Sequence, residues 1–144
     1  MLTAKDVAQF FIMKGLDDEE SGISNLKLQK LLYYAKGFHQ AIFDEPLFPE
    51  KLWAWTYGPV VPDVYHEYKK YGRGPITELE YDPTPKLDED QTELLNEVWS
   101  VLGQFSAWKL RDMSHNEKPW LDHERDASMI EDEELSAYFK TRVK

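Results

Sequence analysis

Four histidines are the side chains best suited to bind a metal or transfer a proton: His39, His66, His115 and His123. His115 and His123 are separated by a proline and lack the i, i+4 spacing of a zinc-binding pair on a helix. The sequence contains no cysteine, which excludes thiolate ligands, thiol nucleophiles and disulfides. We therefore expect neither a metal site nor a cofactor.

The carboxylates occur mainly in runs, at residues 17–20, 88–90 and 131–134. Such runs usually form solvated faces or helix N-termini, whereas acid–base catalysis needs two carboxylates in different environments. Ser114 and His115 are adjacent, but a serine nucleophile needs its base close in space rather than in sequence. We therefore do not expect an enzyme. The alternative is an enzyme that uses His115 with Asp112 or Glu117 nearby.

The charge balance bears on possible partners, because the chain carries 27 acidic and 17 basic residues, a formal net charge of −10. An acidic surface repels a phosphate backbone, so nucleic-acid binding is not expected, and it attracts proteins with a basic surface. DNA binding remains an alternative only if five lysines converge on one face: Lys27, Lys30, Lys36, Lys69 and Lys70. No apolar run approaches the roughly 20 residues that span a membrane, and residues 1–15 do not resemble a secretory signal. We expect a cytoplasmic protein.

The elements that position these side chains are mainly helices. Thr3, Ser24 and the pair Asp88 and Gln91 are suited to cap helix N-termini, and Gly15 is suited to end the first helix. Apolar spacing and these signals predict helices over residues 4–14, 25–43, 62–71, 88–105 and 106–113, within 115–122, and over 132–141. The expected fold is mainly α, a compact bundle of five to seven helices in one domain over residues 1–144, with at most a small two-stranded β ribbon.

Residues 52–57 alternate as a strand does, and Gly58 with Pro59 is expected to stop it. Residues 76–81 are the candidate for a second strand. The helix over 25–43 should lie at the centre of the fold, since its apolar residues share one side. Lys27, Lys30 and Lys36 fall largely between those apolar residues.

Three segments stand out, at residues 25–35, 53–62 and 110–120. The first is a core helix, although burial explains Gln29, Lys30 and Tyr33 less easily. In the second, three aromatic residues share one side that a small ribbon cannot fully cover, and such residues are favoured at interfaces. The third is either a turn held by hydrogen bonds of His115, with Trp120 in the core, or a recognition loop. The candidate partner-binding residues are Lys30, Tyr33, Trp53, Trp55, Tyr57, Gly58, Pro59, His115 and Trp120.

The order and spacing of strings in these segments resemble the Panacea antitoxin domain family, which includes SocA-like antitoxins and phage-associated GepA-like proteins. The strings are residues 27–35, Tyr57-Gly58-Pro59-Val60, and Ser114-His115 with Pro119-Trp120. The resemblance spans residues 3–139. It implies a helical antitoxin domain that neutralises a toxin protein by direct contact. It also implies an alternative, a proteolytic adaptor that delivers a bound partner to a ClpXP-type protease complex.

Overall fold

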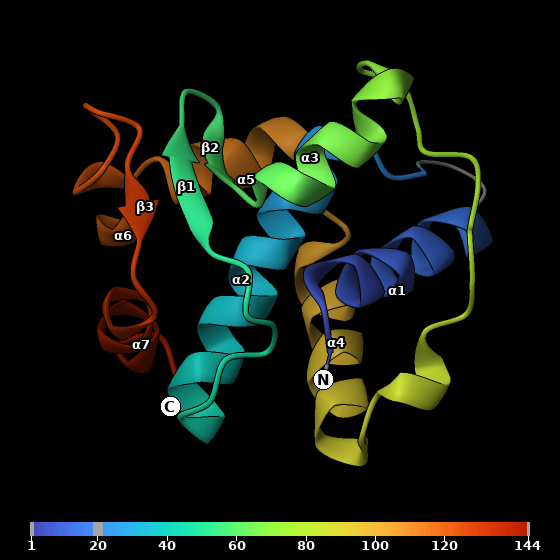
Figure 1. The fold of residues 1–144 in the computed structure, drawn as a ribbon, viewed down its shortest axis with the longest axis horizontal. Coiled ribbons are helices and arrows are strands. Elements are labelled where there is room, and N and C mark those ends of the chain that lie inside the picture. Colours follow the sequence, from blue (N-terminus) through green and yellow to red (C-terminus); the bar gives the residue numbers. More distant parts are fainter. Residues whose placement is uncertain (1, 19–21, 144) are drawn as a thin grey trace.

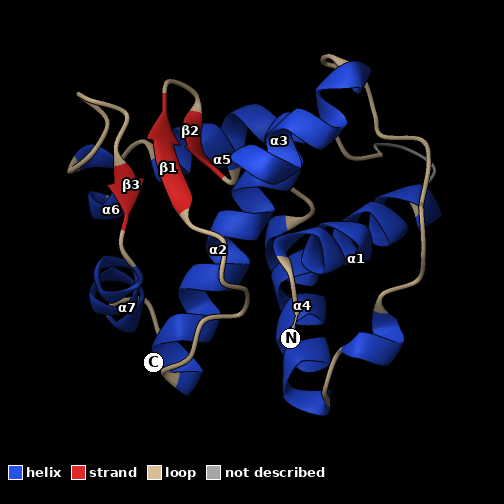
Figure 2. Cartoon of the chain, in the orientation of Figure 1, coloured by secondary structure: helices blue, strands red, loops and turns tan. Residues whose placement is uncertain are grey.

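A computed structural model describes residues 2–18 and 22–143. The helices of this part are α1 (Ala4–Asp17), α2 (Asn25–Phe43), α3 (Pro62–Tyr68), α4 (Glu89–Leu102), α5 (Ala107–Ser114), α6 (Lys118–Leu121) and α7 (Asp132–Lys140), with short 3-10 turns η1 (Lys69–Tyr71) and η2 (Thr84–Lys86). The strands are β1 (Leu52–Trp55), β2 (Gly58–Val60) and β3 (Met129–Ile130). The expected mainly α fold is confirmed (Figures 1 and 2). Within the described ranges, no helix is long and apolar enough to cross a membrane.

Helix α2 runs through the middle of the fold, with α1 and α4 on one side and α7 and the sheet on the other (Figure 1). Its residues Leu28, Leu31, Leu32 and Ala35 are completely buried, as their helical spacing predicts. Gly37 allows α7 to approach closely, because a Cβ atom there would lie 2.2 Å from a ring carbon of Phe139. The core is therefore organised around one helix that is covered on several sides.

The helix starts follow the capping signals. Thr3 forms a capping box with Asp6, the Ser24 side chain accepts a hydrogen bond from the Lys27 amide, and the predicted box at the start of α4 is present. The expected end of the first helix at Gly15 is wrong, because α1 continues to Asp17. Gly15 packs against Ile23, where a Cβ atom would approach that side chain to 3.1 Å. A glycine at position 15 therefore allows α1 to pack closely against Ile23. Positions 19 and 20 of the first acidic run lie outside the described residues.

The sheet has the strand order β2-β1-β3 and is antiparallel, with Trp53 opposite Val60 and Trp55 opposite Gly58. The expectation that Gly58 and Pro59 stop the strand is wrong. The chain turns at Thr56 and Tyr57, and Gly58 and Pro59 belong to the next strand, β2. Pro59 is compatible with this position because β2 is an edge strand, where a missing N–H leaves no ladder hydrogen bond unmade.

Residues 76–81 do not form the expected second strand. The segment is held by a side chain instead, since Gln9 Oε1 accepts hydrogen bonds from the amides of Glu80 and Tyr81 at 2.8 and 3.3 Å. The third strand, Met129–Ile130, was not predicted, and it pairs with the start of β1 through Leu52 and Trp53. Two residues are too few to show an alternating pattern.

Candidate functional site

The three conspicuous sequence segments meet beneath the β1–β2 hairpin. From α2, the Lys30 ammonium donates a hydrogen bond to the Pro59 carbonyl at 2.9 Å. From α6, the Trp120 indole N–H donates to the Trp55 carbonyl at 2.7 Å. We use the name hairpin clasp for Lys30, Ser114, His115 and Trp120 at the underside of the hairpin, together with the hairpin residues Gly58 and Pro59 that Lys30 and Ser114 approach.

Lys30 is completely enclosed, and no carboxylate among the described residues forms an ion pair with it. Burial, with the nearby positive charge of Arg111, lowers the pKa of Lys30 to about 7. Beside it, Gln29 Oε1 accepts a hydrogen bond from the Val61 amide at 2.8 Å. These two side chains thus bind outward-facing backbone groups at the β2 edge, which closes that edge to a strand from another chain.

Lys27 and Lys36 are also buried, and like Lys30 each binds a backbone carbonyl of a remote segment. The Lys27 ammonium donates to the Gly103 carbonyl, and the Lys36 ammonium donates to the Glu50 carbonyl at 2.6 Å. Burial lowers the pKa of both lysines. Three lysines of α2 therefore join the central helix to remote segments of the backbone and do not form the surface patch that the DNA-binding alternative requires.

Tyr33 is also buried, and it belongs to a polar network centred on Glu117. The Tyr33 and Tyr34 hydroxyls donate to the two carboxylate oxygens of Glu117 at 2.8 and 3.0 Å, and the Arg142 guanidinium donates to one of them at 3.0 Å. Burial and the Glu117 charge raise the pKa of both tyrosines well above the usual value. The sequence analysis missed this network because its members are far apart along the chain.

His115 is stacked flat on Trp120, with ring centroids 3.9 Å apart and an interplanar angle of 7°. Its Nε2 atom is buried and has no hydrogen-bond partner among the described residues. Burial, then the positive charge of Arg111, lowers the pKa of His115. The Ser114 hydroxyl donates to the Arg111 carbonyl rather than to the imidazole, and Glu117 is engaged elsewhere. The expected buried Trp120 is confirmed, but stacking rather than imidazole hydrogen bonds supports the turn.

The other histidines are dispersed. His39 Nδ1 lies 2.7 Å from the Glu45 carbonyl oxygen, and His123 lies 2.7 Å from the Ser128 hydroxyl and 2.6 Å from a Glu134 carboxylate oxygen. The Ser128 amide also donates to the His123 carbonyl, so this group closes a turn. Within the described ranges, no cluster of three or more histidine, aspartate or glutamate residues is arranged to hold a metal ion.

The outer side of the hairpin borders a groove of about 720 Å³, the hairpin groove. Trp55 forms part of its wall and packs edge-on against Tyr65 at 5.3 Å between ring centroids. Tyr57 and Trp108 are 56% and 58% exposed. The groove is lined by Ser24, Asn25, Leu26, Gln29, Trp55, Thr56, Tyr57, Val60, Tyr65, Lys69, Gly72, Arg73, Ala107, Trp108 and Ala127.

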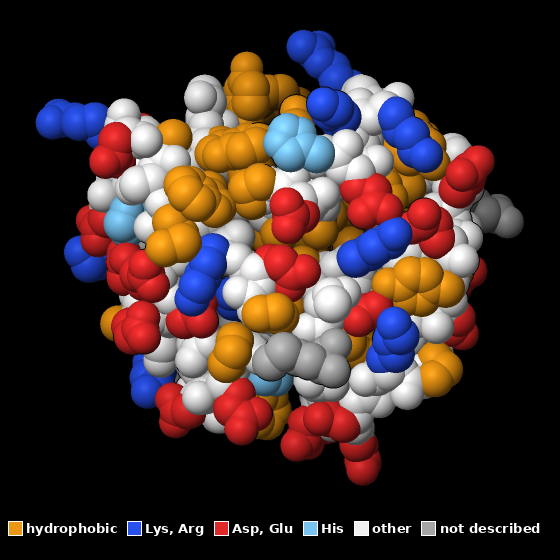
Figure 3. Space-filling model, in the orientation of Figure 1, with side chains coloured by type: hydrophobic (Ala, Val, Ile, Leu, Met, Phe, Trp, Pro, Cys, Tyr) orange, Lys and Arg blue, Asp and Glu red, His pale blue; other side chains and the backbone are white. Residues whose placement is uncertain are grey.

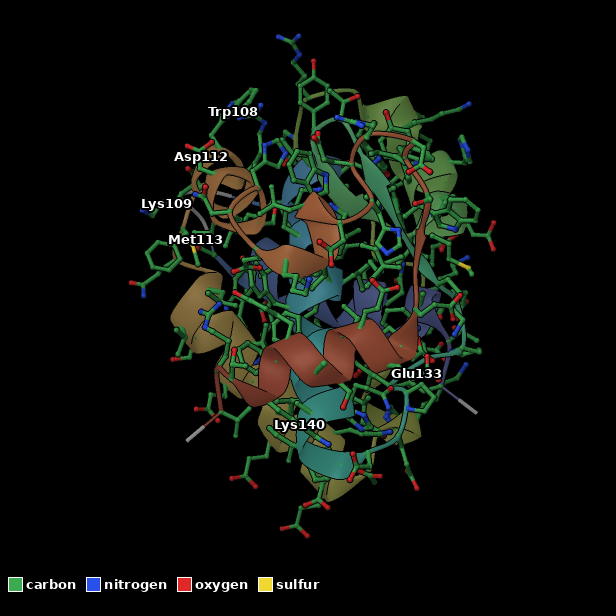
Figure 4. All side chains as sticks on the ribbon, turned by 90° about the vertical axis from the view of Figure 1, so that its left-hand side faces the viewer. Trp108, Lys109, Asp112, Met113, Glu133 and Lys140 are labelled. Atoms are coloured by element: carbon green, nitrogen blue, oxygen red, sulfur yellow. The ribbon has the colours of Figure 1, made fainter. Side chains whose placement is uncertain are left out.

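Tyr57 and Trp108 form an exposed aromatic pair, with ring centroids 6.3 Å apart in an edge-to-face arrangement. The Arg111 guanidinium lies 5.7 Å from the Tyr57 ring and 5.1 Å from the Trp108 ring. Figure 4 shows Trp108 at the outer surface of α5. The sequence analysis missed Trp108, although its position two residues before buried Leu110, about 200° around the helix, indicates the opposite face.

Trp53 is 38% exposed and lies outside the groove, beside a shallow depression that Pro62 and Met129 also line. The candidate residues therefore divide by exposure. Trp53 and Tyr57 are exposed and Trp55 is partly exposed, while Lys30, Tyr33, Gly58, Pro59 and Trp120 are buried. His115 is partly buried beneath the hairpin.

Comparison with known proteins adds two findings. A family model described as antitoxin SocA-like, Panacea domain, matches residues 28–121, which include the whole hairpin clasp. The antitoxin SocA of Caulobacter vibrioides (strain NA1000 / CB15N) is 34% identical to the chain in an alignment over 109 residues, which covers 68% of this chain and 58% of that protein. The chain thus spans somewhat more than half the length of this relative. No solved structure matches.

Proposed function

The chain belongs to the family of SocA-like antitoxins with a Panacea domain, and on this premise we propose that it neutralises a cognate toxin protein by direct contact. The observation that carries the proposal is the exposed aromatic surface beside the groove, where Tyr57 of the hairpin turn and Trp108 of α5 are more than half exposed. Large rings are favoured anchors in protein interfaces because each buries much area at a small cost in side-chain entropy. Tyr57, Trp108 and Trp53 are the proposed contacts, with Trp55 supporting them.

The hairpin clasp has a positioning role in this proposal. Lys30 of α2 and Trp120 of α6 bind backbone carbonyls of the two hairpin strands, and His115 stacks on Trp120. An interface held in its bound conformation loses less conformational entropy on association. Lys30, Gly58, Pro59, His115 and Trp120 therefore act on toxin binding through the shape of the hairpin. Tyr33 acts through the Glu117 network.

The formal net charge of −10 supports a toxin with a basic surface, because opposite charge raises the association rate. The proposed setting is the cytoplasm. The second candidate function is that of a proteolytic adaptor, which delivers the bound toxin to a protease. The two differ in one observable, since masking leaves the toxin half-life unchanged or longer and an adaptor shortens it.

The test is growth of cells induced for the product of the adjacent gene, with and without this chain. The proposal predicts growth arrest by that product alone and recovery when the chain is present. Recovery should be lost with Tyr57→Ala/Trp108→Ala and kept with Val101→Ala/Leu121→Ala, which removes two exposed apolar side chains outside the groove. Equal recovery with both variants would contradict the proposed surface, and a shortened toxin half-life would favour the adaptor.

A further inference from the structure

The charged side chains that line the hairpin groove are cationic. Lys69 and Arg73, both exposed, lie at its rim, and no aspartate or glutamate is among the lining residues. In Figure 3, Lys and Arg side chains gather near the end of α3, beside apolar side chains over the hairpin. This positive rim belongs to a chain with a formal net charge of −10, so its sign is opposite to that of the whole protein.

The two rim cations are available to a ligand. Neither forms an ion pair with the residues in 2–18 or 22–143. The nearby acidic residue Glu67 of α3 is already paired with Lys5 at 2.6 Å. Arg111, which touches the exposed rings, is paired with Asp112 at 3.1 Å and is not counted among the free cations.

The interior of the groove suits apolar or aromatic side chains. Trp55 and Tyr65 provide ring surfaces, and Val60 adds an aliphatic one. The volume of about 720 Å³ lies within the range of roughly 300–1,000 Å³ typical of pockets that enclose a ligand. A partner would therefore insert a few side chains here, rather than lay a flat face over the opening.

We infer that the hairpin groove binds an acidic segment of the toxin, in which an aromatic or aliphatic anchor is flanked by carboxylates. This inference rests on the proposed function. The anchor packs between the groove rings, and the carboxylates pair with Lys69 and with the Arg73 guanidinium, whose fork geometry suits bidentate binding. Because Gln29 and Lys30 already bind the outer edge of β2, the segment binds through side chains rather than as an added strand.

A nucleic acid fits these observations less well. A polynucleotide needs a path of several cations along its backbone, whereas the groove offers two, and the surrounding surface repels phosphate. The net repulsion also makes the salt dependence of binding a poor test, since screening weakens local attraction and global repulsion together. Reversal of the rim charges separates these two effects.

The experiment measures fluorescence anisotropy of labelled peptides with the full chain. The probes are Asp-Glu-Trp-Glu-Leu and its uncharged counterpart Asn-Gln-Trp-Gln-Leu. The acidic peptide should bind at least about tenfold more tightly, a difference near 1.4 kcal/mol. Lys69→Glu/Arg73→Glu should remove this preference while circular dichroism shows an unchanged fold. Lys109→Glu/Lys140→Glu makes the same charge change outside the groove, with Lys140 far from Trp108 (Figure 4), and should keep the preference.

Two binding results would overturn the inference. One is equal affinity for the acidic and uncharged peptides. The other is tighter binding of a twelve-residue thymidine oligonucleotide, lost in the Lys69→Glu/Arg73→Glu variant, which would assign the groove to nucleic acid. The toxin assay separates this inference from the proposed function. Full neutralisation of the toxin by the Lys69→Glu/Arg73→Glu variant would contradict the acidic-segment inference alone. Failure of the unaltered chain to neutralise the toxin would contradict the proposed function.

Discussion

The Lys30 ammonium binds the Pro59 carbonyl at 2.9 Å inside the protein, at the edge of β2 where another strand would otherwise pair. Pro59 has no N–H of its own, so this edge position leaves an acceptor and no donor to satisfy. One lysine of the central helix thereby fixes the hairpin and closes the sheet. This buried contact lies two residues from Tyr57, the exposed ring at the hairpin turn.

The buried lysine predicts a particular pH dependence of stability. The unfolded chain keeps the Lys30 proton up to about pH 10.5, whereas the folded chain loses it near pH 7. Between these values the unfolded state binds more protons, so the free energy of unfolding rises with pH, by about 2 kcal/mol from pH 7 to pH 9. Lys30→Met should remove this rise. Urea unfolding at both pH values measures it, and identical slopes in the two proteins would contradict the prediction.

The Glu117 network predicts a large loss of stability when Glu117 is substituted, although glutamate is usually a surface residue. Glu117→Ala leaves the buried Tyr33 and Tyr34 hydroxyls without their acceptor. The free energy of unfolding should fall by about 2–4 kcal/mol, because buried polar groups without partners are costly. Glu97→Ala on the exposed side of α4 is the control and should change it by less than about 0.5 kcal/mol. Similar losses in both variants would argue against the network.

The close approach of α2 and α7 predicts a steric effect at Gly37. A methyl group there would overlap the Phe139 ring, so Gly37→Ala should lower the free energy of unfolding by about 1–3 kcal/mol. Combining it with Phe139→Leu should recover part of that loss, because the smaller side chain makes room. Gly74→Ala, where the nearest atom lies 3.4 Å from the added carbon, is the matched control. Additive losses in the double variant would contradict this packing.

Local signals predicted the helices well. The capping residue Ser24 and the apolar spacing that follows it placed α2 at its observed bounds, because both features act within a few residues of each other. Strand β2, the partner of β1 in the hairpin, was not predicted because its contacts lie outside its own segment. Gly58 and Pro59 are typical turn residues, but here they pair with Trp55 and Ala54 of β1, and Lys30 binds the outward-facing carbonyl of Pro59.

The candidate site was predicted only in part. Sequence indicated that segments around Lys30, Trp55 and His115 were unusual, and the structure places them together under one hairpin. In a pattern of helical spacing, lysine is assigned to the surface, so the burial of Lys30 was not expected. Its partner is a backbone carbonyl, which has no sequence signature. The aromatic pair of Tyr57 with Trp108 joins residues from different elements, and no local pattern connects them.

The central claim, that the exposed rings of the hairpin groove contact the toxin, is tested most directly by toxin affinity in isothermal titration calorimetry. Tyr57→Ala/Trp108→Ala should weaken binding by about 2 kcal/mol or more, roughly 30-fold, because both rings are proposed anchors. Val101→Ala/Leu121→Ala removes two side chains of similar exposure elsewhere and should change the affinity by less than about threefold. An unchanged affinity in the Tyr57→Ala/Trp108→Ala variant, with its fold intact, would contradict the claim.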